Sequence, residues 1–557
     1  MDLYFSKTLK IDSYDGFHLI QDHVGTNHSA PWDDWDFTVK FKLYYVNKGE
    51  RQNLGFLRLL VNGNKDTSKF FVNNGEEKEK NIYRINDTFD STKAVSLPLD
   101  IDFYHKLNKL LSTNVQIELI LSLVCDASYF YSEIDTFREW DGFSGCLMRE
   151  GSSSEAILRK GHQIAIGRYS PQESFTIDIN VSSESIDPIQ FYFDNNRDVG
   201  KTNINLLTGK NGVGKSFLLN EISEIVTGLQ EIGDKWPYFH KLIMVAYSPF
   251  EDFLTKDELL DKLDKKYSNK KKRRKSNTPA RRRLNVNEYA YVGFRNINGN
   301  FNINWPKFHS VESLIKILKF DKENNWWEER GRFEVLKETL NLCVDFESIA
   351  IKSKNSGELI PIESVSTKSI DILLNEASKE EGLYFIKNKK ALSLSSGQKI
   401  YSYMIPAIVA EIENESLIIL DEPELYLHPH LEVGLINMMK YLLEETSSYS
   451  IIATHSAILT REVERRGVKI LRKDGTKTIV DSPSFETYGE TLDTIIGEVF
   501  DDYVTEKPFQ SNLDHFIEKA DNIKDILDEV GPTVGDEALA YIISKTSDDS
   551  EYIVENE

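Results

Sequence analysis

The sequence predicts an α/β protein built around a buried sheet, with a phosphate-binding loop at one edge of it. Three segments carry this prediction. Residues 209–216 read GKNGVGKS and stand between an apolar run at 204–207 and an amphipathic stretch that begins at Phe217. Residues 417–424 read LIILDEPE, and residues 451–455 read IIATH. The apolar runs have the length and composition of central strands, and each ends in polar residues that the sheet delivers to one edge.

The glycine-rich segment follows the spacing G-x-x-x-x-G-K-[ST]. Its glycines let backbone N–H groups turn inward around phosphates, and the helix N-terminus behind them adds partial positive charge. We expect Lys215 to reach the β- and γ-phosphates of ATP and Ser216 to ligate Mg²⁺. The alternative, a chance glycine-rich turn, is disfavoured because strand, loop and helix agree. The predicted ATP-binding residues here are Gly209, Lys210, Asn211, Gly212, Val213, Gly214, Lys215, Ser216 and Phe217.

Two acids follow the second apolar run. A parallel strand ending at Leu420 delivers Asp421 to the carboxyl edge of the sheet, where we expect it to bind Mg²⁺ directly or through water. Glu422 then points at the γ-phosphate and is the candidate general base, or positioner, of the attacking water. In isolation, two acids could merely end a strand, but the phosphate loop favours the catalytic interpretation.

The segment 394–398 reads LSSGQ and resembles the LSGGQ signature of ABC-type ATPases, with Ser396 in place of a glycine. His455 resembles the switch histidine of that family, which contacts the γ-phosphate. The resemblance implies a P-loop ABC-type ATPase head with a mixed sheet and a helical lobe. It also implies a head-to-tail dimer that sandwiches two ATP molecules, each capped by the signature of the facing subunit. The signature residues implied to bind ATP are Ser395, Ser396, Gly397 and Gln398.

The composition of the signature fits such a cap. Residues 395–397 open a helical pattern that runs to Ile412, with Pro406 expected to kink it. A helix start with small hydroxyl residues and free N–H groups is an anion receptor. An ordinary capped helix is the competing interpretation.

Other details resemble the RecF-like and OLD-like ATPases. Residues 421–429 match their DEPE-x-x-LHP pattern, and residues 485–489 with Val499 look like the closing portion of these proteins. The segment 245–252 stands where the family's Q-loop belongs but lacks the usual glutamine, which leaves the Mg²⁺ sensor of that loop open. In overall layout the chain resembles the PtuA-like ATPases of Septu and retron-associated defence systems. The ATPase resemblance covers roughly residues 171–500.

The PtuA-like resemblance implies a homo-dimer or higher homo-oligomer. It also implies that this oligomer acts as the sensor or the regulator of a separate nuclease subunit of the HNH type. Retron-associated members add a reverse transcriptase with its nucleic acid. About a hundred residues follow His455, too few for a TOPRIM nuclease, and no His-Asn-His arrangement is present. We therefore expect any nuclease to be another polypeptide. The alternative is a RecF-type repair ATPase that acts directly on DNA.

Bulk composition sets the broad class. The chain has 557 residues, enough for two to four domains, and a net charge of −22. No apolar run approaches the ~20 residues that span a bilayer, and the start has no secretory pattern, so we expect a cytoplasmic protein without membrane contact. Three separated cysteines, Cys125, Cys146 and Cys343, lack metal-type spacing and are expected to pack in a reducing compartment.

One segment is strongly basic, although the net charge of the chain is negative. Lys265 to Arg283 contains eleven Lys or Arg residues and no acid, so the remainder of the chain carries −22 − 11 = −33. Such a block is either a solvated tether or a patch that contacts DNA or RNA, and both interpretations stay open.

The chain divides into five expected parts. Residues 1–170 form a β-rich accessory or assembly region, with strands predicted near 37–45 and 115–124 and a short helix around Leu107 to Leu111. The other expected parts are the first half of the ATPase head (171–255), a helical insertion lobe (256–390), the second half of the head (391–500) and an acidic helical tail (501–557). Sustained heptads and a Cys-x-x-Cys hook are absent, which excludes long coiled-coil arms.

Overall fold

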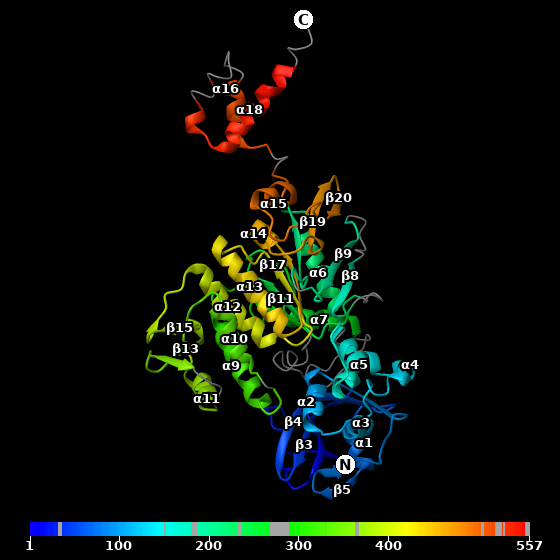
Figure 1. Cartoon of the computed structure of the whole chain (residues 1–557). Helices are drawn as coiled ribbons and strands as arrows, with labels where there is room; N and C mark the ends of the chain where they lie inside the picture. Colours follow the sequence, from blue (N-terminus) through cyan, green and yellow to red (C-terminus); the bar gives the residue numbers. More distant parts are fainter. Residues whose placement is uncertain are drawn as a thin grey trace. The chain divides into compact units, whose positions relative to one another are not determined.

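The computed structural model describes the chain except for residues 32–35, 150–151, 180–185, 198, 231–236, 268–288, 329, 363–366, 503–505, 518–525, 527–529 and 552–557. It forms two compact units, residues 1–489 and 490–557 (Figure 1). The expected five-part division of the chain stays a prediction. Within the described residues, no helix combines the length and apolar character needed to cross a bilayer.

The N-terminal region contains a seven-stranded sheet with the strand order β5-β6-β1-β2-β3-β4-β7. Its strands are β1 (Leu3–Ser6), β2 (Gly16–Gln21), β3 (Lys40–Asn47), β4 (Glu50–Val61), β5 (Glu76–Glu79), β6 (Ile82–Arg84) and β7 (Ala94–Pro98). Its helices are α1 (Thr67–Asn74), α2 (Asp102–Leu110), α3 (Asn114–Leu123), α4 (Ile134–Arg138) and α5 (Ser152–Ala165). The strand near 37–45 and the helix around Leu107 are confirmed, whereas the region as a whole is mixed α/β, because helices cover at least as many of its described residues as strands do.

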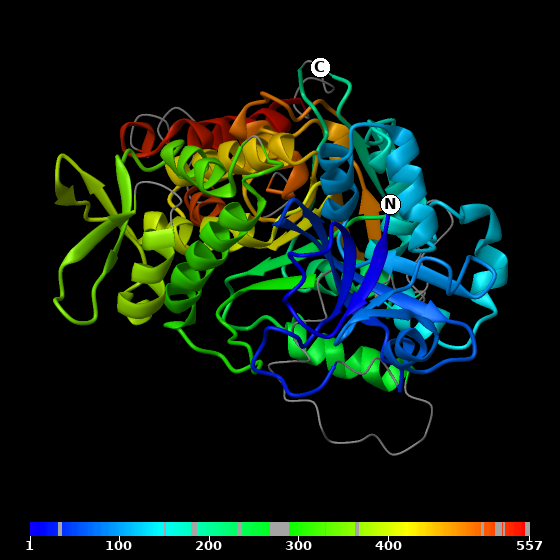
Figure 2. The same cartoon turned by 90° about the horizontal axis from the view of Figure 1, so that it is seen from below.

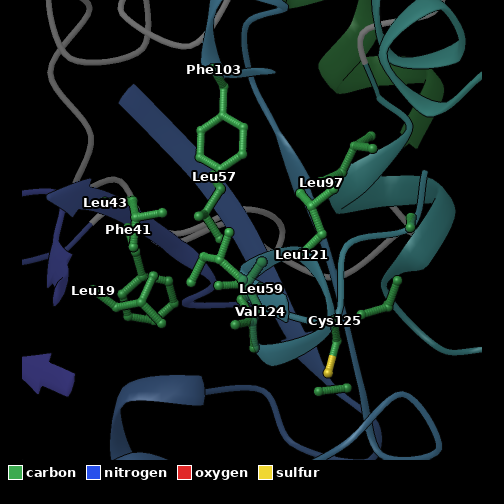
Figure 3. Packing of buried hydrophobic residues seen from close by; sticks show 14 of the residues in the cluster. Leu19, Phe41, Leu43, Leu57, Leu59, Leu97, Phe103, Leu121, Val124 and Cys125 are labelled. Atoms are coloured by element: carbon green, nitrogen blue, oxygen red, sulfur yellow. The ribbon is translucent and has the colours of Figure 1, made fainter. Parts of the chain in front are cut away.

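The predicted strand at 115–124 is wrong, because these residues form α3. Thr113 caps the helix by accepting a hydrogen bond from the N–H of Gln116. The buried residues Ile117, Ile120 and Leu121 recur at helical spacing, whereas Val115 is 76% exposed. Leu121 and the following Val124 and Cys125 pack into the same core as strand residues such as Leu59 (Figure 3). A nearly continuous apolar run does not distinguish a strand from a buried helix.

A second seven-stranded sheet, ordered β12-β11-β17-β18-β10-β19-β20, forms the centre of the head. All its neighbouring pairs are parallel except β19 with β20, so the sheet is mixed, as predicted. Its strands are β10 (Ile204–Gly209), β11 (Leu242–Ala246), β12 (Tyr289–Gly293), β17 (Leu417–Asp421), β18 (Tyr449–Ala453), β19 (Val468–Asp474) and β20 (Lys477–Asp481).

Strand register brings the predicted motifs to one edge of this sheet. Asp421 on β17 pairs with Ala453 on β18, and Ala453 also pairs with Leu207 on β10. The phosphate loop, the acids after β17 and His455 after β18 therefore leave the sheet side by side. The remaining head elements are β8 (Ser174–Ile179), β9 (Ile189–Asp194), α6 (Lys215–Val226), α7 (Lys256–Tyr267), α13 (Pro429–Glu445) and α14 (Ala457–Arg461).

The insertion lobe combines long helices with a small antiparallel sheet of order β14-β13-β15-β16. Helix α9 packs along α12, which enters from the second half of the head (Figures 1 and 2). The lobe elements are α9 (Trp305–Asn324), α10 (Arg332–Asn341), β13 (Ser348–Lys352), β14 (Leu359–Ile362), α11 (Thr367–Glu376), β15 (Tyr384–Lys387), β16 (Lys390–Ala391) and α12 (Ser396–Glu411). The lobe is thus helical, as expected, and carries a sheet that sequence patterning did not reveal.

Buried charges join the N-terminal region to the head. Lys160 on α5 donates hydrogen bonds to the Glu415 carboxylate (2.8 Å) and to the Tyr238 carbonyl (2.9 Å), and the Tyr169 hydroxyl also donates to Glu415 (2.8 Å). Glu415 lies in the turn that leads into β17, the strand that ends at Asp421. The accessory region is therefore fastened to the strand that carries the acidic motif.

Two further predictions concern the basic block at residues 265–283 and the C-terminal tail. In the basic block, Lys265 and Lys266 end α7, and residues 268–283 lie outside the described residues. The predicted tail is helical, with α16 (Pro508–Ile517) and α18 (Asp536–Glu551). The second unit also includes α15 (Leu492–Val499), which was expected in the second half of the head. Its small core contains Leu513, Ile526 and Ile542.

Candidate ATP-binding site

The backbone of the phosphate loop requires glycine. Gly209 has a φ of 139°, and a Cβ there would lie 2.4 Å from the carbonyl oxygen of Leu471 on β19. Gly214 has a φ of 107° and directly precedes α6. Thr478 on β20 donates a hydrogen bond of 2.8 Å to the Val213 carbonyl and so ties the loop to the sheet. No side chain of the described residues caps α6, which leaves its first N–H groups for an anion.

Lys215 lies at the centre of the site and is 6% exposed. Its Nζ atom donates to the Gly209 carbonyl (3.0 Å) and lies 2.6 Å from Nε2 of His455 and 3.9 Å from Oε1 of Glu422. Burial lowers the pKa of Lys215, whereas the nearby carboxylates raise it, Glu422 most strongly. The ammonium group is thus held where a triphosphate bound by the loop would meet it.

His455 and Glu422 form the opposite wall. Nε2 of His455 lies 3.2 Å from Oε1 of Glu422, so a protonated ring donates to Glu422 and a neutral ring accepts from Lys215. The hydrogen bond from His455 lowers the pKa of Glu422, with further lowering by the charge of Lys215. Glu422 also has a φ of 46°, a left-handed conformation that is costly for a non-glycine residue. Its N–H donates to the Ala453 carbonyl (2.9 Å), which fixes the strained turn against β18.

Asp421 and Ser216 supply adjacent oxygen atoms. The Ser216 hydroxyl lies 3.1 and 3.3 Å from the two carboxylate oxygens of Asp421. Burial raises the pKa of Asp421 to about 6, against the lowering effect of the Ser216 hydrogen bond. A hydroxyl beside a buried carboxylate fits Mg²⁺, which takes one or two protein oxygens and completes its shell with phosphate and water. The described residues contain no group of three His, Cys, Asp or Glu side chains that could hold a metal alone.

The signature opens α12 with a reciprocal cap. The N–H of Ser395 donates to Oε1 of Gln398 (3.0 Å), and the N–H of Gln398 donates to the Ser395 hydroxyl (3.3 Å). Ser395 and Ser396 are exposed, whereas Gly397 is buried, and a Cβ on it would lie 2.4 Å from Cδ1 of Leu431. Within the described chain the Ser395 hydroxyl thus caps the helix, Ser396 is exposed, and Gly397 packs against the start of α13. Pro406 lies inside this helix, as predicted.

The remaining predicted loop residues lie on the open side of the site. Lys210, Asn211, Gly212, Ser216 and Phe217 are exposed at the turn and at the first turn of α6. In the segment after β11, Glu251 accepts hydrogen bonds from the Tyr291 hydroxyl (2.6 Å) and the Phe253 N–H (2.8 Å). This acid is therefore committed to β12 and does not replace the missing glutamine.

Two residues of the site were given no role by sequence analysis. Glu424 accepts hydrogen bonds from the Thr454 hydroxyl (2.7 Å) and the His455 N–H (2.6 Å). It stands inside the DEPE pattern, which was the available signal. Thr478 holds the phosphate loop from β20, 265 positions later in the chain, and no local pattern marks it.

Comparisons with known proteins support a nucleotide-binding ATPase domain. Residues 262–461 match the family model described as "AAA domain, putative AbiEii toxin, Type IV TA system". The matched range includes the signature, Asp421, Glu422 and His455. Protein ea59 of Escherichia phage lambda is 24% identical over 524 residues, which cover 90% of this chain and 91% of ea59. The Septu protein PtuA of Bacillus thuringiensis is 25% identical over 283 residues, 45% of this chain and 66% of PtuA.

The solved structures that match the chain include an ATP-binding cassette and an SmcHead. The ATP-binding cassette MJ1267 of an ABC transporter, in its ADP conformation, has a TM-score of 0.28 at 11% identity, covering 60% of this chain and all of that chain. An SmcHead bound to the C-winged helix domain of ScpA has a TM-score of 0.27 at 13% identity, and the match covers 54% of this chain and 94% of that chain. Residues 262–461 are thus similar to an AAA domain, the chain has the motif geometry of a P-loop ATPase domain, and it has weak similarity to a Septu protein PtuA.

Proposed function

We propose that this chain binds Mg·ATP and hydrolyses it to ADP and phosphate. The observation that carries the proposal is the convergence of Lys215, His455 and Glu422 within 3.9 Å of one another at the mouth of the phosphate loop. These groups come from three separate segments, and a shared structural role alone does not explain a buried lysine facing an acid and a histidine.

Each residue has a chemical task in this proposal. The loop N–H groups and Lys215 bind the β- and γ-phosphates, and His455 contacts the γ-phosphate. Ser216 and Asp421 would hold Mg²⁺, which supplies charge neutralisation on the phosphates when bound. Glu422, whose lowered pKa keeps it ionised, orients the attacking water and accepts its proton.

We further propose that two copies complete each other's sites. Ser396 is exposed at the start of α12, and we expect its hydroxyl and the N–H groups of the first turn that the cap does not use to form an anion receptor. In a head-to-tail dimer this receptor caps the γ-phosphate held by the facing copy. ATP binding then closes the pair and hydrolysis opens it, which gives two discrete states.

The cellular role that we propose is regulation of a separate nuclease subunit of the HNH type in anti-phage defence. The similarity to the Septu protein PtuA, and the occurrence of a full-length relative in a phage, support a role in phage–host conflict. Co-expression with any HNH-type nuclease that a neighbouring gene encodes tests it, with or without a reverse transcriptase and its nucleic acid. A stable complex whose nuclease activity depends on ATP is expected. DNA binding by the chain alone, with no such complex, contradicts this role and favours a RecF-type ATPase.

The test of the enzymatic proposal is Glu422→Gln in the full chain. Loss of the general base is expected to lower turnover by roughly 10²- to 10⁴-fold while ATP still binds. Glu312→Gln, at a lobe acid that pairs with Lys379, is the matched control and keeps full turnover. Phosphate release measures turnover, and fluorescent-nucleotide titration measures binding. Unchanged turnover in Glu422→Gln contradicts the proposal.

A further inference from the structure

Glu424 lies between the catalytic acids and α13 without facing the phosphate loop. We propose that Glu424 is a positioning residue, which fixes the backbone of His455 and thereby aims the imidazole at Lys215 and the γ-phosphate. The inference deepens the proposed ATPase function and rests on it for its kinetic consequence. Its structural content, that one carboxylate sets the position of the His455 backbone, can be measured without ATP turnover.

The contacts of Glu424 are concentrated on the end of β18. One oxygen, Oε1, accepts both the Thr454 hydroxyl (2.7 Å) and the His455 N–H (2.6 Å). Hydrogen bonds to a carboxylate are shorter and stronger than neutral ones, so this pair is a firm attachment. Thr454 is itself held, because its N–H donates to the Leu207 carbonyl of β10 (3.1 Å). The attachment therefore connects the acidic loop to the strand that carries the phosphate loop.

A second acid from the same stretch holds the next residue. Ser456 donates its hydroxyl to Glu432 on α13, which is 8% exposed, and caps α14 by accepting from the Leu459 N–H (3.1 Å). The segment 454–456 is thus fastened at both ends to the stretch 424–432. His455 lies between these two attachments. They fix the position of its backbone and therefore the direction in which its ring leaves the chain.

This stretch also contacts the signature helix. Gly397 packs against Leu431, and the Tyr401 hydroxyl of α12 donates to the Leu431 carbonyl. Leu431 precedes Glu432, one of the two acids that hold the segment 454–456.

The second carboxylate oxygen of Glu424, Oε2, makes it possible to distinguish the role of the hydrogen bonds from the role of the charge. Oε2 is buried and has no hydrogen-bond partner among the described residues. Burial raises the pKa of Glu424, and its charge contributes to raising the pKa of Asp421. A buried carboxylate oxygen without a hydrogen-bond partner lowers the free energy of unfolding, so stability alone does not favour a glutamate at this position. Glutamine keeps an acceptor at Oε1 and removes the charge, whereas alanine removes both hydrogen bonds.

The kinetic experiment compares Glu424→Gln, Glu424→Ala and Thr454→Val. We expect Glu424→Ala to lower kcat by roughly 10- to 100-fold, with KM for ATP changed less than about threefold, because a misplaced catalytic group impairs the reaction more than binding. Glu424→Gln is expected to restore kcat to within about fivefold of wild type, and Thr454→Val to fall between. Glu464→Gln, at another buried acid of the head, controls for general destabilisation.

A double-variant cycle tests whether Glu424 acts through His455. In a His455→Ala background, Glu424→Ala is expected to cause no further loss of kcat. An equal additional loss in that background overturns the proposal, as does a loss confined to KM.

A magnetic resonance measurement keeps the test independent of turnover. In protein labelled with ¹⁵N-histidine, the His455 amide proton, assigned with His455→Ala, is expected far downfield because it is bonded to a carboxylate. The resonance is expected to move upfield in Glu424→Ala and to stay near its position in Glu424→Gln. An unmoved resonance in Glu424→Ala overturns the proposal. Absent turnover in wild type combined with the expected shifts contradicts only the ATPase function.

Discussion

Nζ of Lys215 and Nε2 of His455 lie 2.6 Å apart although 240 positions separate the residues in the chain. The sheet produces this contact. Strands β10 and β18 are parallel neighbours in the register Leu207 with Ala453, so the loop after one strand meets the residue after the other. The two motifs are read separately along the sequence and become one site only through the strand order.

Replacement of Lys215 tests the phosphate contact. Lys215→Ala is expected to abolish measurable turnover and to weaken ATP binding by at least roughly tenfold, since one charge-assisted contact contributes about 1.5–3 kcal/mol. The loss also leaves Glu422 facing the triphosphate without the positive charge of the lysine. Nucleotide titration of Lys215→Ala beside Lys262→Ala, which removes a lysine paired with Glu224 outside the site, measures the effect. Equal affinities in the two variants contradict the assignment.

The close approach of Gly209 to β19 predicts a stability effect. Gly209→Ala places a Cβ 2.4 Å from a backbone oxygen at a positive φ, and we expect a loss of about 2–4 kcal/mol. Gly212→Ala has a positive φ of 78° but no atom within 4 Å, so its cost is limited to about 1–2 kcal/mol. Thermal unfolding of both variants is the measurement. A Gly212→Ala variant that unfolds earlier than Gly209→Ala contradicts the packing described for the loop.

The helical assignment of α3 makes a position-specific prediction. Leu121 is fully buried, so Leu121→Ala is expected to cost about 2–5 kcal/mol. Leu119 is 44% exposed on the opposite face, and Leu119→Ala is expected to cost less than about 1 kcal/mol. In a strand the two residues would share one face and respond alike. Similar melting temperatures for the two variants therefore contradict the helix.

An ion cluster around Glu411 at the end of α12 predicts a pH dependence. Burial alone would raise the pKa of Glu411, but the charges of Lys316 and Lys241 hold it well below its ordinary value. A carboxylate with a depressed folded-state pKa stabilises the fold above its unfolded pKa, and this stabilisation disappears as pH falls through the folded value. Glu411→Gln lacks that titration. Its melting temperature is expected to fall less steeply than that of wild type between about pH 5 and pH 3, and parallel curves contradict the assignment.

Much of the head could be predicted because its motifs are local. The glycine spacing of the phosphate loop predicts both the strand before it and the helix after it. The acids that follow Leu420 indicate where the next strand ends. Helix α3 could not be predicted, because in VQIELILSLV the apolar residues fill both faces of the pattern and only the tertiary core selects one. Glu424 and Thr478 were missed for another reason. Their partners lie 30 or more positions away, so their roles arise from the assembled sheet.

The composite pocket is the central claim, and complementation between two inactive variants tests it most directly. Lys215→Ala removes the phosphate contact and keeps the signature, whereas Ser396→Arg blocks the signature and keeps the phosphate contact. A mixed pair has one pocket with both defects and one with neither. Equal mixing is therefore expected to restore about a quarter of wild-type turnover, since half of the pairs are mixed and each has one intact pocket. Two variants that are each inactive and stay inactive when mixed would contradict shared pockets.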